Sequence, residues 1–332
     1  MSTAPASCIR PSDSSSPLEC LCCGLIVTDL VCAPLVRIPR PGELLVTPSL
    51  TLTIGGCAAN VAVNLARLET RVGIAGRIGN DDLGDFASRV LQRAGVETST
   101  LRVESAVQTS ATQVVNVQGE DRRFIHAVGA NALLDGSEIT PEQLQGVKVL
   151  YVGGFLLNRN WSGAKLKPLL NSARLAGART VLDVVLTDAA DFWPDLAEVL
   201  PETDLFLPNS DEAEQLTGLS DPLEQAIRFR EAGAGTVVIT RGAEGALLVS
   251  DRSTVWSDAF PTQYVDGTGS GDAFAAGYIR GILEGASEQD CLAMGSALGA
   301  SCVRCAGATT GVFQQQELRQ YLASHPFSVR QG

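Results

Sequence analysis

Strand-like and helix-like patterns of apolar residues alternate along most of the chain. Leu21–Val31 is largely apolar, which predicts a buried first strand, and Ala58–Leu68 then places apolar residues at helical spacing. Later segments repeat the alternation, with strands predicted at Arg71–Ile78, Val147–Val152, Thr180–Val185, Asp204–Leu207, Thr236–Thr240 and Ala246–Ser250, and a helix at Leu83–Ala94. This alternation predicts an α/β fold in which helices cover both faces of a mostly parallel sheet.

Two segments interrupt this alternation. Residues 32–54 contain strand-like runs around a turn at Pro39–Gly42, and residues 108–128 predict two strands joined at Gln118–Glu120. Together they predict a small sheet, which is either a lid over a substrate site or an edge extension of the main sheet. The expected organisation is a flexible, Ser-rich tail at residues 1–19, followed by one domain over residues 20–325.

Composition limits the partners that this fold can have. The 332 residues include 25 Lys and Arg against 37 Asp and Glu, a net charge of −12, which argues against a nucleic-acid or anionic-membrane surface. No apolar run is long enough to span a bilayer, and no signal-peptide core is evident near the start. We therefore expect a cytoplasmic location.

The nine cysteines are expected to be reduced in that compartment. Cys22 and Cys23 lie in a strand pattern, whereas Cys302 and Cys305 form a CxxC pair in a helical pattern. A zinc site would need a second such pair or histidine ligands, and the chain has only two histidines. Buried structural thiols are therefore predicted.

The clearest candidate chemistry lies in the segment DGTGSGDAF, from Asp266 to Phe274. The segment follows a predicted strand and precedes a predicted helix over Ala273–Leu283. Its glycines let backbone N–H groups at the helix start face the charge of a transferring phosphoryl group. The Asp272 carboxylate, kept ionised by the helix dipole, can accept a proton from an alcohol. The same pattern allows Asp272 to be only a helix cap.

This segment resembles the second signature of the ribokinase (PfkB) family of carbohydrate and nucleoside kinases, which is D-T-x-G-A-G-D-x-F in outline. Gly267 and Ser270 replace the usual Thr and Ala. The resemblance, which covers most of the chain, implies a ribokinase-like three-layer α/β/α domain with a small β lid. It also implies transfer of a phosphoryl group from ATP, with Mg²⁺, to a hydroxyl group. Asp272 would be the catalytic base, and Gly269, Ser270 and Gly271 would form the anion hole.

Two further segments resemble the parts of this family that hold the acceptor. Gly55–Asn60 (GGCAAN) matches the first signature, G-G-x-x-x-N, and Asp29 matches an acidic residue at a strand end. Alone, they would be a glycine turn before a helix and a solvated carboxylate. The resemblance implies that the acceptor is bound by Asp29, Gly55, Gly56 and Asn60. Arg123 and Asn131, which flank the second lid segment, are further candidate substrate contacts.

The nucleotide side is indicated by Pro208–Glu212 (PNSDE), which is similar to the family's N-x-x-E motif. The resemblance implies that Asn209 and Glu212 organise magnesium-bound water and nucleotide phosphates, although the same pair is also a helix-capping signal. A segment similar to the turn near the ATP phosphates supplies three more candidates, Thr240, Gly242 and Gly245.

Two candidate cation positions complete the site. Asp183 ends a predicted strand, where it would either meet substrate or metal-bound water or cap a turn. The family often binds a monovalent cation such as K⁺ beside the anion hole. The resemblance places such a cation near Asp266 and Thr268, with Gly307–Ala308 as a further source of backbone oxygens.

The acceptor is less well defined than the reaction. Val27 and Cys57 stand where ribokinase has polar residues, and the Gly153–Gly154 region lacks the acidic residue expected for ribose. A sugar, sugar acid or related polyol other than ribose is therefore favoured. A nucleoside kinase and a non-catalytic, kinase-like ligand-binding protein remain alternatives. The resemblance also implies a homodimer formed through the lid strands.

Overall fold

The structure is a computed structural model that describes residues 17–120, 123–187 and 191–332. Of the predicted flexible tail, residues 1–19, the first 16 residues lie outside the described part of the chain. At its end, the Glu19 carboxylate accepts a 3.4 Å hydrogen bond from Nζ of Lys148 and lies 3.6 Å from Nε of Arg71. These contacts join Glu19 to the main domain.

Within the described residues, ten strands form a central sheet in the order β14-β13-β12-β11-β10-β9-β8-β1-β4-β5. Strands β5 through β11 in this order pair in parallel, and β12, β13 and β14 are added antiparallel. The strands are β1 Cys20–Gly24, β4 Val72–Gly79, β5 Leu101–Glu104, β8 Val149–Phe155, β9 Arg179–Val184, β10 Leu205–Phe206, β11 Thr236–Thr240, β12 Ala246–Val249, β13 Thr254–Ser257 and β14 Val329–Gln331.

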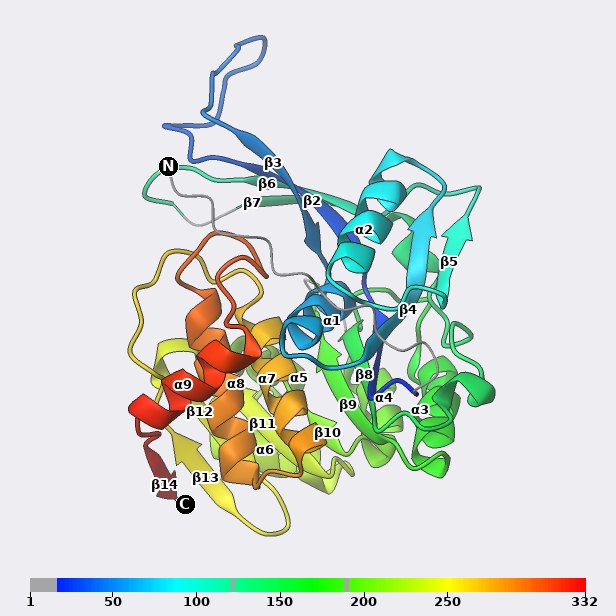
Figure 1. Ribbon diagram of the computed structural model, residues 1–332, viewed down its shortest axis with the longest axis vertical. Coiled ribbons are helices and arrows are strands. Elements are labelled where there is room, and N and C mark those ends of the chain that lie inside the picture. The colour runs from blue at the N-terminus through cyan, green and yellow to red at the C-terminus, as the bar shows by residue number, and fades with distance from the viewer. Residues whose placement is uncertain (1–16, 121–122, 188–190) are drawn as a thin grey trace.

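Helices cover both faces of this sheet (Figure 1). One face packs against α1, α2, α7, α8 and α9, and the other packs against α3, α4, α5 and α6. The α-helices are α1 Cys57–Arg67, α2 Asp82–Arg93, α3 Gly163–Leu175, α4 Trp193–Val199, α5 Ser210–Thr217, α6 Pro222–Glu231, α7 Ser270–Glu284, α8 Glu288–Cys302 and α9 Gln315–Ser324. Short 3-10 helices are η1 Gly129–Leu133, η2 Pro141–Leu144, η3 Leu200–Glu202 and η4 Gly242–Glu244.

The strand residues explain this arrangement. In β1, Cys20 and Cys22 belong to the core on one face, whereas Leu21 and Cys23 belong to the core on the other. Since successive strand side chains point to opposite faces, an apolar run such as this is suited to burial on both sides. The predicted mostly parallel α/β sheet is therefore present, with three layers.

The predicted first strand, Leu21–Val31, is wrong as a single element. The chain leaves the main sheet at Gly24, whose φ is 141° and whose Cα faces the carbonyl oxygen of Gly153 too closely for any side chain. Pairing resumes in β2, Val27–Cys32, which belongs to a second sheet. The apolar pattern continues through the break, so it could not reveal the change of sheet.

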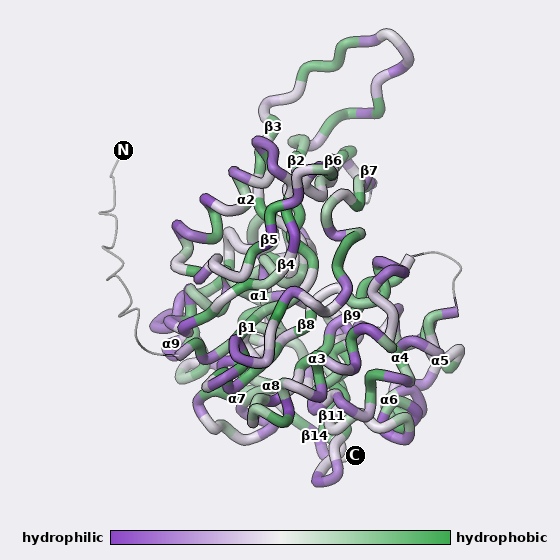
Figure 2. Tube along the Cα trace, turned by 90° about the vertical axis from the view of Figure 1, so that its right-hand side faces the viewer, coloured by the Kyte–Doolittle hydropathy of each residue, from purple (hydrophilic) through white to green (hydrophobic). Residues whose placement is uncertain are grey.

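The second sheet has the order β3-β2-β6-β7, where β3 is Leu50–Gly55, β6 is Ala111–Val115 and β7 is Arg123–Ala127. It is separate from the main sheet, so the edge-extension alternative is wrong. Residues 33–49, predicted to contain strand-like runs, form only an isolated bridge between Leu35 and Val117. This segment projects beyond the second sheet at the top of Figures 1 and 2, and it carries hydrophobic residues (green in Figure 2).

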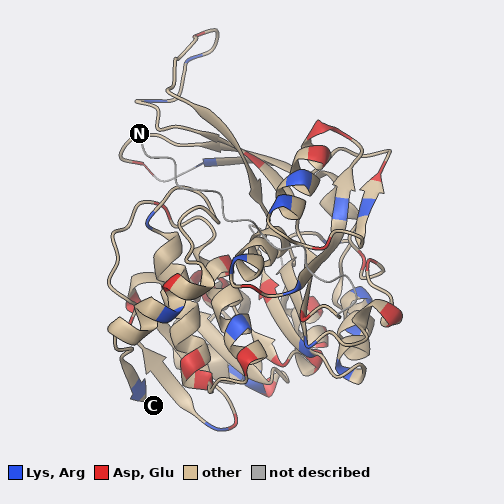
Figure 3. Ribbon diagram, viewed as in Figure 1, with Lys and Arg blue, Asp and Glu red and all other residues tan. Residues whose placement is uncertain are grey.

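The cysteine prediction is correct in part. All the described cysteines are free thiols, and Cys22, Cys23 and Cys302 are buried. Cys305 is exposed, because α8 ends at Cys302 and does not reach it. Among the described residues, no helix is both long and apolar enough to cross a membrane. Acidic and basic side chains are interspersed over the elements seen in Figure 3.

Candidate active site

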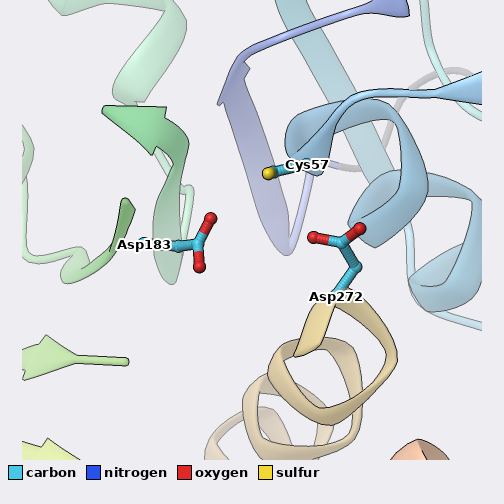
Figure 4. A group of neighbouring side chains, drawn as sticks. All are labelled: Cys57, Asp183 and Asp272. Atoms are coloured by element: carbon cyan, nitrogen blue, oxygen red, sulfur yellow. The ribbon is translucent and has the colours of Figure 1, made fainter. Parts of the chain in front are cut away.

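The predicted motifs meet at one edge of the main sheet. Asp183 lies near the end of β9, Asn209 follows β10, and Thr240 is the last residue of β11. These parallel strands end on the same side, where open α/β sheets bind their ligands. The first turn of α7, with Asp272, lies across from the end of β9 in Figure 4.

Asp272 does not cap its helix. The residue before α7 is Gly269, with a φ of 74°, and no side chain caps this helix start. The Asp272 Oδ2 atom accepts a 2.8 Å hydrogen bond from Nδ2 of Asn60, on α1. This bond joins the two predicted signatures, so the simple capping alternative is wrong.

Three side chains from different elements converge beside this pair (Figure 4). Cys57 begins α1, Asp183 comes from β9 and Asp272 from α7, and their sulfur and oxygen ligand atoms all lie within 4.8 Å of one another. Burial raises the pKa of the Cys57 thiol, and the nearby carboxylates raise it further. Cys57 is therefore a neutral thiol beside two acids.

The acidic groups of this cluster disfavour one another's ionisation. Burial, with a smaller contribution from the Asp29 charge, raises the pKa of Asp272 to about 6. Burial and the charge of Asp272 raise the pKa of Glu212 to about 7, against the hydrogen bonds from Asn209. The pKa of Asp183 is also raised, first by burial and then by Glu212 and Asp272. The three carboxyl groups thus share one electrostatic environment.

This donor set fits a hard divalent cation. Carboxylate oxygens are preferred ligands of Mg²⁺, and a dication would relieve the repulsion that raises these pKa values. A neutral thiol is a poor Mg²⁺ ligand, so Asp183 and Glu212 are the residues that could hold the ion, directly or through water. Asp183 also accepts a 3.2 Å hydrogen bond from the backbone N–H of Gly154, which fixes its carboxylate.

The predicted capping pair is present at the start of α5. The backbone N–H of Glu212 donates to Asn209 Oδ1, and the backbone N–H of Asn209 donates to Glu212 Oε2, both at 2.9 Å. The capping alternative is therefore confirmed. The charge of Asp272 also raises the pKa of Glu212, so the capping residue interacts electrostatically with the cluster as well.

The acceptor motifs lie beside Asp272. An added Cβ at Gly55 would overlap the Asp29 carboxylate, so only glycine leaves room for that side chain. Burial raises the pKa of Asp29 to about 6, opposed by a hydrogen bond from Thr112. Gly56 precedes α1 and accepts a 2.9 Å hydrogen bond from the backbone N–H of Asn60. The structure thus brings the Asp29, Gly55–Gly56, Asn60 and Asp272 positions together.

The register of the second sheet shows which residues share a face with Asp29. Asp29 of β2 pairs with Thr53 of β3 and Thr112 of β6, and Thr112 pairs with His126 of β7. Cross-strand partners share a face, so one face of the second sheet carries Asp29, Thr112 and His126. Thr112 and His126 were missed by the sequence analysis. Their alternation within the predicted lid strands could have identified them.

Two other candidate contacts, Asn131 and Arg123, differ in their surroundings. Asn131 is fully buried, and its amide group bonds to both backbone groups of Ile26, at 3.3 Å to the N–H and 3.0 Å to the oxygen. It therefore holds the link between β1 and β2, and we withdraw it as a substrate contact. Arg123 is exposed and pairs with Glu120.

The predicted phosphate turn lies next to the N-x-x-E motif. Thr240 forms a bridge with Asn209, and its backbone N–H donates a 3.1 Å hydrogen bond to the Pro208 oxygen. Gly242 begins the short helix η4, and Gly245 follows it. An added Cβ at Gly242 would meet nothing within 4 Å, so this turn is open on that side.

The predicted monovalent-cation position is a tightly bonded loop. The Asp266 carboxylate accepts 2.9 Å hydrogen bonds from the backbone N–H groups of Thr268 and Gly307. The thiol of Cys302 donates to the backbone oxygens of Thr268 at 3.3 Å and Ala308 at 3.5 Å. The backbone oxygens of Thr268 and Ala308 therefore lie close to one thiol in this loop.

Comparisons with known proteins show which family this chain resembles. Residues 18–315 match the family described as pfkB family carbohydrate kinase. Over 286 residues, the chain is 30% identical to 2-dehydro-3-deoxygluconokinase of Bacillus subtilis, covering 82% of this chain and 87% of the relative. Aminoimidazole riboside kinase of Salmonella typhimurium is also 30% identical, over 82% of this chain and 88% of its own. A putative ribokinase II from E. coli, in complex with ATP and Mg²⁺, superposes with a TM-score of 0.80 at 23% identity, covering 93% of this chain and 100% of that one.

The fold and the shared edge site define a phosphotransferase that acts on a hydroxyl group. The chain belongs to the pfkB family of carbohydrate kinases, since the family match covers most of its length. The predicted family and the ribokinase-like three-layer α/β/α fold are thereby confirmed.

Proposed function

We propose that this protein transfers the γ-phosphoryl group of ATP to a hydroxyl group of a sugar or sugar-like small molecule. The observation that carries the proposal is the Asp272 carboxylate, held at 2.8 Å by Asn60 at the glycine-lined start of α7. That position combines a proton acceptor with backbone N–H groups suited to phosphoryl charge.

In the proposed step, the Asp272 carboxylate takes the proton of the acceptor hydroxyl. The hydroxyl oxygen bonds to the γ-phosphorus, and the bond from that phosphorus to the β-phosphate oxygen breaks, so ADP leaves. The N–H groups of Gly269, Ser270 and Gly271 stabilise the charge on the transferred group. Asp29 and Asn60 hold the acceptor, which contributes positioning.

The nucleotide and cations would lie at the strand ends. Asn209, Glu212 and Asp183 would hold Mg²⁺, and Thr240, Gly242 and Gly245 would line the ATP phosphates. Mg²⁺, when bound, neutralises phosphate charge. The loop of Asp266, Thr268 and Gly307–Ala308 would bind K⁺, where the positive charge would keep the anion hole ordered.

A sugar or sugar acid is the favoured acceptor. The 30% identical relative from Bacillus subtilis is a 2-dehydro-3-deoxygluconokinase, which supports a sugar acid. The buried Val27 and the neutral thiol of Cys57 offer little hydrogen bonding where ribokinase is polar. The alternative is a nucleoside acceptor, which the aminoimidazole riboside kinase relative supports.

The second sheet would act as the lid of this site and as a dimer surface. Leu52, Leu30, Gln113 and Ile125 form one row across it, on the face opposite Asp29. Leu52 is 38% and Ile125 is 69% exposed, which leaves apolar surface for a second copy of the chain. The free thiols are consistent with a reducing, cytoplasmic location.

Magnesium-dependent ADP release tests the proposal over a panel of sugars, sugar acids and nucleosides. One panel member should raise ADP release at least about tenfold above the acceptor-free rate, with no release in EDTA. If panel members raise the melting temperature but none stimulates ADP release, the non-catalytic alternative would replace this proposal.

A further inference from the structure

A cavity of about 400 Å³ lies away from the candidate active site. Its lining includes the first residues of three parallel strands, namely Arg179 of β9, Leu205 of β10 and Thr236 of β11. Tyr278 and Ile282 of α7 line it as well. Since the active-site motifs follow the other ends of these strands, the cavity lies at the opposite edge of the sheet and has no part in the proposed reaction.

Two arginines line the cavity. The guanidinium groups of Arg179 and Arg252 belong to its lining, and across the described chain neither has an ion-pair partner. Both residues are exposed, so a small molecule entering the cavity can reach them. Unpaired arginines lining a concave surface are suited to bind phosphate or carboxylate groups.

The acidic residues of the lining are already engaged. Asp251 pairs with Arg230, which lies outside the lining. Glu288 accepts hydrogen bonds from the hydroxyl groups of Ser250 at 3.1 Å and Ser253 at 2.9 Å. The remaining acid, Asp204, accepts a 2.9 Å hydrogen bond from the backbone N–H of Thr180 and lies 3.5 Å from Nε of Arg174. In the described chain, three charged groups of the lining therefore have no ion-pair partner, namely Arg179, Arg252 and Glu288, and the two arginines outnumber the one acid.

The inner part of the cavity is less polar. Tyr278 and Cys291 are buried, and burial raises the pKa of both groups, while the charge of Arg179 acts in the opposite direction. The charge of Arg179 therefore reaches the inner wall. Ile282 adds apolar surface. The cavity thus combines two arginines with apolar side chains.

We propose that this cavity binds a small organic anion, a metabolite that carries a phosphate or carboxylate group, and that its binding changes the activity of the distant site. The cavity volume suits a molecule of metabolite size. The ligand's anionic group would meet Arg179 and Arg252, and its carbon skeleton would contact Ile282.

Two helices connect the cavity to the active site. α7 carries Asp272 in its first turn and Ile282 in the cavity, about 15 Å further along the helix. α8 returns from Cys291 in the cavity to Cys302, whose thiol contacts the loop before α7. The helices pack backbone to backbone, because a Cβ at Gly277 would lie 2.5 Å from the Met294 oxygen. A shift of α7 at the cavity would therefore move its first turn.

Binding is tested on the full-length protein by thermal shift, with the nucleotide site saturated by magnesium and a non-hydrolysable ATP analogue. The probes are glycerol 3-phosphate, glycerate and glycerol, which differ only in the group they carry. We expect the melting temperature to rise by about 2 °C or more with at least one anion and not with glycerol. The responding anion identifies the class of ligand, phosphate or carboxylate.

Variants locate the response. Arg179→Gln combined with Arg252→Gln should abolish the shift, while the melting temperature without probe and the ADP release stay near the wild-type values. Arg319→Gln, an exposed arginine on α9 outside the cavity lining, should keep the shift. No shift with either anion, or a shift that the double variant retains, would overturn the site.

Coupling is measured separately with the responding anion. A saturating probe should change kcat or KM by about fivefold or more in the wild-type protein and leave the double variant unchanged. Binding without a kinetic effect would overturn the regulatory role. Because binding is read without turnover, failure of the proposed kinase activity would be distinguishable from failure of this site.

Discussion

At the residue scale, the proposed reaction requires the Asp272 carboxylate to be ionised where burial disfavours its charge. Burial raises the pKa of Asp272 to about 6, and the Asp29 charge adds to the effect. Asn60 opposes the shift, because its amide donates to the ionised carboxylate. Asp272 is thus a stronger base than an exposed carboxylate, and it is still ionised at neutral pH.

The pH profile should reflect this balance. Only ionised Asp272 can accept the proton, so kcat/KM should fall below an apparent pKa of about 6. In Asp29→Asn, loss of a like charge should move the acidic limb to lower pH, although acceptor binding weakens. The profile of Asp290→Asn, a first-turn acid of α8, should keep its limb. An Asp29→Asn limb that stays in place would contradict the coupling of the two groups.

The same pKa has a consequence for stability. Its folded-state value, about 6, exceeds an unfolded value of about 4, so the folded state binds a proton more tightly. The free energy of unfolding should therefore fall as pH rises from about 4 to about 6. Asp272→Asn removes this loss, so its melting temperature should exceed that of the wild type by about 2–4 °C at pH 8 and match it at pH 4. A variant less stable at pH 8 would contradict the raised pKa.

The sequence was informative about residues wherever a motif joined them. Asp29, Asn60 and Asp272 were predicted, and they meet in the structure. Asn131 was misassigned, because a sequence does not distinguish an amide that binds substrate from a buried one that binds backbone. Cys57 was noted only as a substitution in the first signature. Its place between two carboxylates depends on strands far apart in the sequence.

At the element scale, the start of α7 depends on glycines with different requirements. Gly269 has a φ of 74°, and an added Cβ would overlap Ala308 in the loop after α8. Gly271, within the helix, would place a Cβ with nothing within 4 Å. The first glycine therefore has a conformational and packing role, whereas the second is replaceable as far as stability is concerned.

Alanine at each position separates these requirements. Gly269→Ala should lower the melting temperature by about 2–6 °C, because it combines a strained φ with a clash. Gly271→Ala should keep the wild-type melting temperature within about 1 °C. Differential scanning calorimetry measures both. Equal melting temperatures for the two variants would show that the loop does not pack against Gly269 as described.

Elements were predicted well where burial gives a continuous pattern and poorly at edges. β11 matches its predicted bounds, and β12 differs from them by one residue, because apolar runs of this kind occur in buried strands. The short strands β5, β13 and β14 were not predicted; β5 and β14 lie at the sheet edges, where fewer residues must be apolar. Residues 33–49 were predicted to contain strands because of their apolar residues. In the structure, most of these apolar residues are exposed and the segment forms no strand.

At the scale of the whole molecule, exposed apolar residues concentrate on the second sheet and its projecting segment. Leu44 and Val46 are 89% and 86% exposed, and Ile125 on β7 is 69% exposed. Surfaces of this kind mark interaction sites in soluble proteins. Local patterns could not reveal this, since the row that joins Leu52 to Ile125 depends on strand order.

A charge on this row should break the proposed dimer. Ile125→Glu would bury a carboxylate in the interface, so the dimer should weaken by at least about 100-fold. Sedimentation velocity measures the effect over a range of concentrations. Leu175→Glu, at another exposed apolar position on α3, should leave the dimer intact. A wild-type protein that stays monomeric at micromolar concentration would contradict the proposed interface.

The central claim is that Asp272 removes the proton from the acceptor, and single-turnover and steady-state kinetics of Asp272→Asn test it most directly. With the stimulating acceptor, kcat for magnesium-dependent ADP release should fall by about 10²- to 10⁴-fold. The affinity for a non-hydrolysable ATP analogue and the thermal shift by the acceptor should change by less than about threefold, and Asp290→Asn should match the wild type. Turnover of Asp272→Asn within a few-fold of the wild type would contradict the claim.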